Sequence, residues 1–482
     1  MKLPVFAQAA CATDLTIAEA LDALRSGRLS SRQLVEACLA RAEAARELNV
    51  FVTLDAAGAL AAADAADAAR RAGLPLKPLA GIPIVVKDNI HAAGLPATAG
   101  TPALADFVPG EDAPSLRPLR EAGAIVLGKT NMHELAFGAT GYNPAFNTGE
   151  LLGVRNPYDF TRIAGGSSSG SAAALGARMA LAALGTDTGG SMRIPCALNG
   201  CASLRPSHGR YSGRGVIPIA PSRDTVGPMA LCMTDVALLD GLISGEAALP
   251  PVTLAGLRLG IAPGFWRDLD ADTRAVAEAA LDKLRAAGVT LVEVGEERLQ
   301  ELTQPIGTLV VIHEARPAMQ AWLREQGPGI DIDELARGIA SPDVQAIYQQ
   351  LVLPSQVPTA EGLVDSAPLY AEAMASGRPA LQAHYAELFE RHALDAFIFP
   401  TTPVVAPAAG PEVNEPACFE RLISNTEPSA SAGLPGIQLP AGLGAASGLP
   451  VGLELDGPAG SDRRLLAIGI ALEAVLGRIP RA

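Results

Sequence analysis

The sequence predicts a single large α/β domain whose mixed, mostly parallel twisted sheet is covered by helices on both faces. Three observations support this fold class. The 482 residues are enough for a deep core. Of these residues 49% are hydrophobic and only 4% are aromatic, so that burial depends mostly on Ala, Leu and Val. Short apolar runs that fit buried strands alternate with stretches of helical periodicity, as in a sheet packed between helices. The 49 glycines and 38 prolines provide many element ends.

Helices are predicted at the start of the chain. Apolar residues within Ile17–Leu24 recur at positions i, i+3, i+4 and i+7, and a second apolar face covers Leu34–Ala42. Ser30 or Ser31 provides the N-cap of this second helix. An Ala/Asp-rich stretch over residues 56–71 predicts a third helix.

Strands are predicted where β-branched residues form short runs. The segment Gly81-Ile-Pro-Ile-Val-Val-Lys87 is such a run, and it is bounded by Asp88, so Lys87 is expected at the C-terminal end of a buried strand. Helical segments separate most of the further candidates. These are residues 124–127, 257–261, 289–294, 396–399, 437–439 and 451–455.

We expect one domain over residues 1–482, with three parts. Residues 1–75 form an N-terminal helical segment, and residues 76–245 form the core that carries the chemical motifs. The pattern breaks near residues 245–251. Residues 297–392 have a mostly helical pattern with long polar faces, which predicts an insertion or cap on the same domain.

Charge and hydropathy argue against nucleic acid and membrane as partners. The chain has 37 Lys and Arg against 51 Asp and Glu, a net charge of −14, and it lacks a basic run that would neutralise phosphates. The Ala-rich run from Ala172 is interrupted by Arg178, well short of the ~20 residues that a span requires. The first residues have too short an apolar stretch for a signal peptide. We therefore expect a cytoplasmic protein.

The cysteines and histidines predict no metal site. The six cysteines are scattered without the close pairs of a zinc site, so we expect reduced core residues. His133-Glu134 begins like a His-Glu-x-x-His zinc helix, but Phe137 stands where the second histidine belongs. His133 is interpreted as a helix-end residue. The cysteines are Cys11, Cys38, Cys196, Cys201, Cys232 and Cys418.

Two Gly/Ser-rich turns carry the chemistry. They are Gly165-Gly-Ser-Ser-Ser-Gly-Ser171 and Gly185-Thr-Asp-Thr-Gly-Gly-Ser-Met-Arg-Ile-Pro195, in which Ser167 and Ser191 lie 24 residues apart. Acyl transfer by a nucleophile needs an activated hydroxyl, a base and backbone amides directed at the developing oxyanion. The segment Thr188-Gly-Gly-Ser191 can supply both the hydroxyl and the amides, since glycines let the backbone approach a substrate carbonyl closely.

The base is expected to be a lysine. None of the six histidines lies within the two serine motifs. An ammonium normally titrates near ~10.4, but burial disfavours its charged form and lowers its pKa by several units. Lys87 follows the apolar run Ile82–Val86, which favours such desolvation.

Together these motifs resemble those of the amidase signature family. The likeness covers about residues 14–240 and returns weakly in residues 397–403 and in the closing strands and helix. It implies that Ser191 forms an acyl-enzyme, that Ser167 follows a cis Gly166–Ser167 bond and relays the proton, and that Lys87 is the base. The oxyanion hole of the family maps to the backbone amides of Thr188, Gly189 and Gly190, with Ser191 as a further donor.

Three residues beside the serines need separate interpretation. The family usually has Gly where this chain has Ser169, so a side chain is added next to Ser167. Asp187 and Arg193 flank Ser191, and for these two we favour an ion pair that holds the turn over a direct catalytic role.

Two further motif matches are set aside. Gly123-Ala-Ile-Val-Leu-Gly-Lys-Thr130 fits the P-loop pattern, but its central apolar residues are themselves the predicted strand. Gly166-Ser-Ser-Ser-Gly170 fits the Gly-x-Ser-x-Gly elbow with Ser168 as nucleophile, yet Arg162–Ala164 is too short for the preceding strand.

The substrate class is inferred from three further segments. Residues 131–138, 210–213 and 217–225 look more like the indoleacetamide and mandelamide hydrolase branch than the tRNA-dependent amidotransferase subunit. The likeness implies hydrolysis of small apolar or aromatic amides, and anilides, carbamates or urethanes would use the same groups. Pocket candidates come from the loop of residues 136–146. They are Ala136, Phe137, Gly138 and Tyr142.

One alternative function stays open beside amide hydrolysis. In it, the chain is the glutaminase subunit of a glutamine-dependent amidotransferase and passes ammonia to a partner protein. For the hydrolase we expect a small-molecule amide or carbamate as the partner, with no cofactor and no metal. A homodimer is one option for its oligomeric state. An inactive scaffold is disfavoured, because all three catalytic positions are filled.

Overall fold

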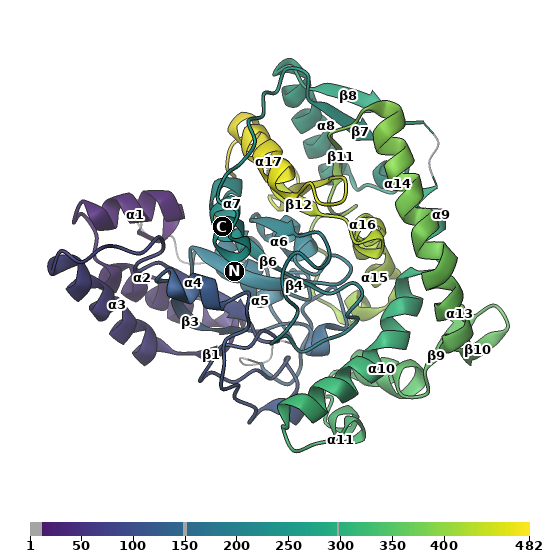
Figure 1. The fold of residues 1–482 in the computed structure, drawn as a ribbon, viewed down its shortest axis with the longest axis horizontal. Coiled ribbons are helices and arrows are strands. Elements are labelled where there is room, and N and C mark those ends of the chain that lie inside the picture. The colour runs from purple at the N-terminus through teal and green to yellow at the C-terminus, as the bar shows by residue number, and fades with distance from the viewer. Residues whose placement is uncertain (1–11, 148–151, 296–297) are drawn as a thin grey trace.

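A computed structural model describes residues 12–147, 152–295 and 298–482 (Figure 1). Within these ranges eleven strands form one sheet, in the order β1-β3-β2-β4-β6-β5-β12-β13-β11-β7-β8, and β9 and β10 pair separately. The strands are β1 Phe51–Leu54, β2 Pro83–Lys87, β3 Ile125–Thr130, β4 Ala182–Asp187, β5 Ala202–Arg205, β6 Thr225–Ala230, β7 Arg258–Ile261, β8 Thr290–Glu293, β9 Gln356–Thr359, β10 Gly362–Asp365, β11 Ala396–Pro400, β12 Gly436–Leu443 and β13 Pro450–Asp456.

The large sheet is parallel at its two flanks and antiparallel in the middle. Strands β3, β2 and β4 pair in parallel, as do β11, β7 and β8. From β4 through β6, β5, β12 and β13 to β11 each pairing is antiparallel, and β1 is antiparallel to β3. The predicted large α/β domain with a mixed sheet is confirmed. Its parallel part lies at the flanks.

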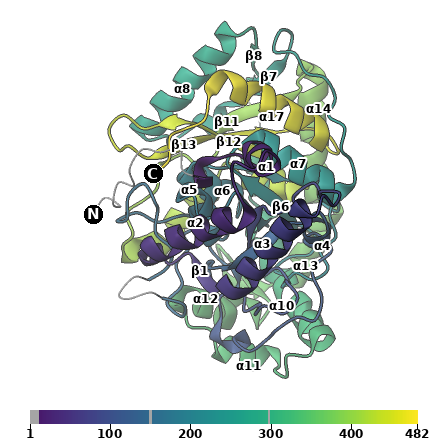
Figure 2. The same cartoon turned by 90° about the vertical axis from the view of Figure 1, so that its left-hand side faces the viewer.

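Helices pack on both faces of this sheet. Successive residues of a strand point to opposite faces. In β12, Ile437 lies against Gly469 of α17, whereas Gln438 lies on the face where Gly452 approaches Ala197 of α6. Helices α6 and α17 therefore cover opposite faces. Figure 2 looks onto the side where α1, α2 and α3 lie in purple.

The α-helices account for most of the remaining regular structure. No helix of the described ranges is long and apolar enough to cross a membrane. The helices are α1 Ile17–Arg25, α2 Ser31–Ala44, α3 Ala56–Arg71, α4 Arg117–Glu121, α5 Ser169–Gly176, α6 Arg193–Asn199, α7 Met233–Ser244, α8 Ala271–Ala286, α9 Leu299–Thr303, α10 Gly307–Gln326, α11 Ile332–Arg337, α12 Pro342–Ile347, α13 Ser366–Glu372, α14 Arg378–His392, α15 Pro416–Ile423, α16 Glu427–Ala432 and α17 Asp462–Leu476.

Most of the predicted elements are confirmed. Helices α1 to α3 occupy the three predicted stretches, and Ser30 caps α2 by accepting the amide of Gln33. Strands β2, β3, β7, β8, β11, β12 and β13 match predicted strands to within a few residues. Strands β1, β4, β5 and β6 and the β9–β10 pair were not predicted.

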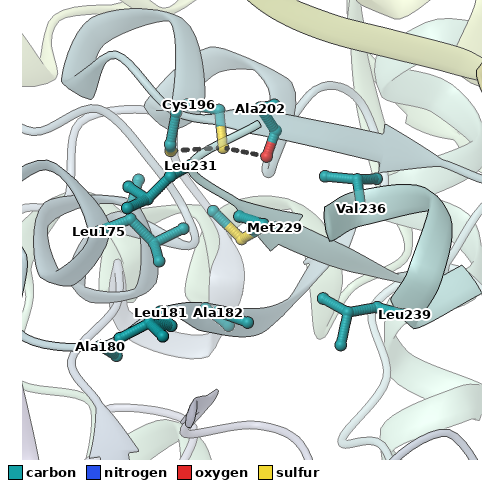
Figure 3. Close-up of a cluster of buried hydrophobic side chains, with 14 of the residues drawn as sticks. Leu175, Ala180, Leu181, Ala182, Cys196, Ala202, Met229, Leu231, Val236 and Leu239 are labelled. Carbon is teal, nitrogen blue, oxygen red and sulfur yellow. Dashed lines mark hydrogen bonds between the residues drawn. The ribbon is translucent and has the colours of Figure 1, made fainter. Parts of the chain in front are cut away.

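The largest core cluster extends from α1 and α2 along the sheet to α8 and α17, and Figure 3 shows the part of it around β4 to β6 and α5 to α7. Leu175 of α5 and Met229 of β6 are fully buried there. Cys196 and Cys201 lie in the same cluster, with their sulfurs 2.8 Å apart as a hydrogen-bonded pair of free thiols. Among the described residues, cysteines 38, 232 and 418 likewise form no disulfide, and Cys11 lies outside the described residues.

Residues 298–392, drawn in green on the right of Figure 1, contain α9 to α14 and the β9–β10 pair. Among the contacts that join this segment to the remainder of the domain, one involves Glu134 and another involves Trp322. The carboxylate of Glu134 accepts the backbone amide of Ser341 (2.6 Å). Trp322 of α10 packs edge-on against Phe107, with ring centroids 5.1 Å apart. We call residues 298–392 the helical segment below.

Candidate active site

The two serine turns and the lysine meet at one edge of the sheet. Strand β2 ends at Lys87 and its parallel neighbour β4 ends at Asp187, with Val86 opposite Leu184. Because β2 and β4 are parallel, their carboxyl ends lie side by side, and ligands of α/β sheets bind outside these ends. Ser167 lies just before α5, and Ser191 lies just before α6.

Lys87 is held by two hydroxyl groups. Its Nζ donates to Ser167 Oγ (2.8 Å) and to Thr186 Oγ1 (2.6 Å), and Asn89 Nδ2 donates to the same Thr186 oxygen (3.1 Å). Lys87 and Ser167 are both fully buried. Burial lowers the pKa of Lys87 to about 7, although the carboxylates of Asp187 and Asp224 act in the opposite direction. A substantial share of Lys87 is therefore a neutral amine near pH 7.

Ser191 is joined to the Ser167 turn through the backbone. The peptide bond between Gly166 and Ser167 is cis, as predicted. The amide of the next residue, Ser168, donates to the carbonyl oxygen of Ser191 (2.9 Å), which fixes the two turns against each other. Ser191 is half-buried, in contrast to the enclosed Ser167. A substrate can therefore reach the hydroxyl of Ser191 more easily than that of Ser167.

The turn before Ser191 is built around a buried ion pair. Arg193 donates to both carboxylate oxygens of Asp187, each at 3.0 Å, so the expected pair is present. Burial opposes ionisation of Asp187, but Arg193 and Arg205 hold its pKa well below the usual range. The amide of Gly190 donates to Asp187 Oδ1 (2.8 Å). Gly190, one of the predicted oxyanion donors, is thus engaged within the turn itself.

Gly190 could not be replaced by a larger residue. Its φ of +136° is a conformation that L-residues avoid, and a Cβ there would lie 2.1 Å from Thr426 Oγ1. Ser169, the departure from the family pattern, is fully buried in the first turn of α5. Its Cβ fills the space beside Gly141, where a further Cβ would approach to 2.6 Å.

Several polar side chains that were not predicted as site residues support this turn. Thr188 Oγ1 donates to Asp224 (2.6 Å), and the carbonyl of Thr188 accepts from Arg223 Nε (3.1 Å). Thr426 donates to the carbonyl of Gly189 (2.6 Å). Asp224 lies in a segment that the sequence analysis had used only for resemblance. Thr186 lies inside the second serine motif, which could have drawn attention to it, whereas Thr426 is too distant in sequence to give any local signal.

The four predicted pocket residues lie in different surroundings. Ala136 is buried, and Gly138 packs where a side chain would not fit. Phe137 packs against Tyr348 of the helical segment, with ring centroids 5.2 Å apart. Tyr142 lines a cavity of about 540 Å³ between the core and that segment. Their contact with substrate therefore stays a prediction.

The rejected motifs have structural roles. Residues 125–130 of the P-loop match are strand β3, as expected. The hydroxyl of Ser168, the elbow candidate, is buried and donates to the carbonyl of Thr186 (3.1 Å). His133 is the N-cap of a short 3₁₀ turn and lies 3.2 Å from Asp343. Among the described residues, no group of three or more metal-binding side chains is present.

Comparison with known proteins agrees with this fold. The Amidase family model matches residues 33–466. Mandelamide hydrolase of Pseudomonas putida is 46% identical, over 99% of this chain and 94% of its own length. Indoleacetamide hydrolase of Agrobacterium vitis is 40% identical, over 96% of this chain and 97% of its own. A solved structure described as an amidase superimposes with a TM-score of 0.82 at 34% identity, covering 96% of this chain and all of that one.

The fold and these relatives define a hydrolase that acts on carbon–nitrogen bonds of amides. The chain belongs to the amidase signature family, and mandelamide and indoleacetamide hydrolases are among its relatives, as the sequence motifs had indicated.

Proposed function

We propose that the protein hydrolyses small aryl or indolyl primary amides through an acyl-enzyme on Ser191. The observation that carries this proposal is the buried contact between Lys87 Nζ and Ser167 Oγ at 2.8 Å, with the lysine pKa near 7. A neutral amine beside a hydroxyl can act as a general base.

The proposed reaction moves one proton in and out of the site. Neutral Lys87 accepts the proton of the Ser167 hydroxyl. Ser167 in turn accepts the proton of the Ser191 hydroxyl while the Ser191 oxygen attacks the amide carbon. The tetrahedral oxyanion is stabilised by backbone amides of Thr188, Gly189 and Ser191. Its collapse breaks the C–N bond, and the proton returns through Ser167 to the leaving nitrogen. Water then attacks the ester by the same relay and restores Ser191.

The substrate class is taken from the relatives. The names of two relatives refer to amides that carry an aromatic group, mandelamide and indoleacetamide. We propose primary amides of this kind as preferred substrates. Anilides and carbamates, including urethanes, present the same carbonyl and nitrogen and are proposed as weaker substrates.

A substrate panel on the purified protein tests the proposal. We expect mandelamide, phenylacetamide and indoleacetamide to be hydrolysed faster than the matching anilides, esters and carbamates. Ser191→Ala, Ser167→Ala and Lys87→Ala should each lower kcat/KM by roughly 10²–10⁴-fold or more, whereas Ser26→Ala at the exposed end of α1 should not. Glutamine turnover that requires a partner protein, without aryl amide turnover, would instead support the amidotransferase subunit.

Covalent labelling tests the nucleophile separately. A sulfonyl fluoride should add to the oxygen of Ser191 with loss of fluoride, and peptide mass spectrometry should locate the adduct there. An adduct on Ser168 would contradict the assignment.

A further inference from the structure

Two buried cysteines lie side by side at the end of α6 that is farther from the nucleophile. The sulfur atoms of Cys196 and Cys201 are 2.8 Å apart (Figure 3), and both side chains are fully enclosed. Cys196 belongs to α6, and Cys201 lies directly before β5. The reaction proposed above uses neither thiol.

The two sulfur atoms are placed for a covalent bond. A disulfide has an S–S distance of about 2.05 Å, so the sulfurs need to approach each other by about 0.8 Å. The amide of Cys201 donates to the carbonyl oxygen of Cys196 (3.1 Å). Gly200 ends α6 with a φ of +68°, so the chain turns back sharply between the two cysteines. This turn holds their side chains together.

Residues 477–482, which follow α17, pass over this turn, and we call them the covering segment. A Cβ added at Gly200 would lie 2.1 Å from Ile479 Cδ1 and 3.1 Å from the hydroxyl oxygen of Tyr158. That hydroxyl donates to the carbonyl oxygen of Pro480 (2.8 Å). The covering segment has no helix or strand and consists mostly of exposed residues, so it opens more readily than the sheet beneath it.

We infer that Cys196 and Cys201 form a reversible oxidation site, at which hydrogen peroxide converts the two thiols into an intramolecular disulfide when the covering segment opens. One sulfur attacks the O–O bond, which breaks to give a sulfenic acid and one water molecule. The second sulfur then displaces the sulfenic oxygen, which leaves with a proton as a second water molecule. Two electrons pass from the thiols to the peroxide, and an added dithiol reverses the reaction.

The surroundings of the two sulfurs differ, which sets the order of the steps. The guanidinium of Arg178, also buried, interacts electrostatically with Cys201. A neighbouring cation stabilises the negative charge that an attacking sulfur carries. Burial raises the pKa of the Cys196 thiol, which makes it the poorer nucleophile. Cys201 is therefore the sulfur that attacks the peroxide, and Cys196 closes the disulfide.

The disulfide is compatible with an active enzyme. Helix α6 begins at Arg193, which contacts Asp187 under the nucleophile, whereas the two thiols lie at the other end of the helix. A small approach of the sulfurs there leaves the turn of Ser191 in place. The bond ties the end of α6 to the start of β5 and restricts the unfolded chain, so it should stabilise the fold.

Peroxide treatment followed by mass spectrometry tests the modification. The treated protein is unfolded in an alkylating reagent and digested, and the tryptic peptide of residues 194–210 contains both cysteines. We expect this peptide to lose two hydrogen atoms and to carry no alkyl group, and dithiothreitol to restore both thiols. Cys418, which is only half-buried, reports that the oxidant has acted. Two alkylated cysteines at a dose that oxidises Cys418, or a sulfinic acid without the disulfide, would overturn the inference.

Cysteine variants locate the effect. Oxidation should raise the melting temperature of the parent by about 1–3 °C and change turnover of its best amide substrate less than twofold. Cys201→Ala and Cys196→Ala each break the pair and should lose this rise. Cys232→Ala removes a buried thiol outside the pair and should behave as the parent does. A loss of activity on oxidation that requires Cys201 would contradict the fit of the disulfide to the native site.

The path of the oxidant is tested at the covering segment. Ile479→Ala loosens the contact over Gly200 and should speed disulfide formation at least about threefold, because the local opening becomes more frequent. Leu363→Ala removes an equally large aliphatic group from an exposed site on β10 and should leave the rate unchanged. Equal rates in both variants would overturn the role of the covering segment.

Discussion

At the scale of single residues, the fully enclosed amine of Lys87 lowers the stability of the fold when it is charged. Its two recorded acceptors are the neutral hydroxyls of Ser167 and Thr186, and no carboxylate is hydrogen-bonded to it. Burial removes the hydration of the ammonium, and the more distant carboxylates of Asp187 and Asp224 offset this only in part. The molecule therefore keeps a reactive base at the expense of folding free energy.

The pH dependence of activity follows from this pKa. The neutral amine is the working form and its pKa is about 7, so kcat/KM should rise with pH and reach half its plateau near pH 7. A pH–rate profile with an uncharged amide measures this. Loss of activity over the same rise would contradict the role of Lys87.

The stability of the fold should respond in the same direction. The pKa of Lys87 is lower in the folded than in the unfolded chain, so the penalty of enclosing its charge is complete below about pH 7 and declines as pH rises toward ~10. Lys87→Met should therefore abolish activity while melting at or above the parent at pH 6, with the advantage shrinking at high pH. Calorimetry at both pH values checks this, and a lower melting temperature at pH 6 would count against it.

Thr186 should act as a positioning residue. It accepts from both Lys87 and Asn89, so Thr186→Val removes the second contact of the lysine at nearly constant volume. We expect kcat to fall by roughly tenfold, with little change in KM and a shifted pH midpoint. Thr290→Val, exposed on β8, provides the matched control. An unchanged pH midpoint together with a higher KM would indicate a role in binding only.

At the scale of elements, the strands whose residue types favour a strand were predicted, and the strands whose residue types do not favour one were missed. Strand β2 is rich in Ile and Val, and its position with Lys87 at the end was predicted. Strand β4 reads Ala-Ala-Leu-Gly-Thr-Asp, which has low β-propensity and continues an Ala-rich run. Only its neighbours β2 and β6 make it a strand, and no local signal carries that information.

The same limit applied to the site. The three catalytic candidates lie in compact motifs and could be named from them. The side chains that support the turn, Arg223, Asp224 and Thr426, approach it from other elements and become visible only when the chain is folded. The commitment of the Gly190 amide to Asp187 is likewise a matter of local geometry.

Helix α6 begins at the charge cluster under the nucleophile, and this cluster should be important for stability. Arg193 contacts Asp187, Glu454 and Ser429, all buried. Arg193→Met leaves Glu454 without its counterion and Asp187 with Arg205 alone, and removal of one partner of a buried ion pair typically costs about 3–5 kcal/mol. Chemical denaturation should show a loss of this size. A loss under 1 kcal/mol would mean that the carboxylates become protonated at little cost.

At the scale of the whole molecule, polar contacts join the helical segment to the core at several places, and Glu134 makes two of them. The carboxylate of Glu134 accepts the amides of Ala340 (3.0 Å) and Ser341 (2.6 Å). Glu134→Ala removes both, so we expect faster amide hydrogen exchange in α11 and α12, with the protection of β2 to β4 retained. Glu325→Ala, exposed at the end of α10, is the control. Equal exchange in both variants would show that the other contacts of the segment hold it without Glu134.

The proposed catalytic groups and the cavity beside the helical segment come from different parts of the chain. The groups proposed to break the bond all come from residues 87–191, whereas a cavity of about 1020 Å³ beside the helical segment is lined by residues between 300 and 428. Insertions, deletions and substitutions in the later stretch therefore leave these groups on an unchanged piece of chain. Recombination that exchanges the later stretch between relatives would thus keep the proposed catalytic groups together on one continuous part of the chain.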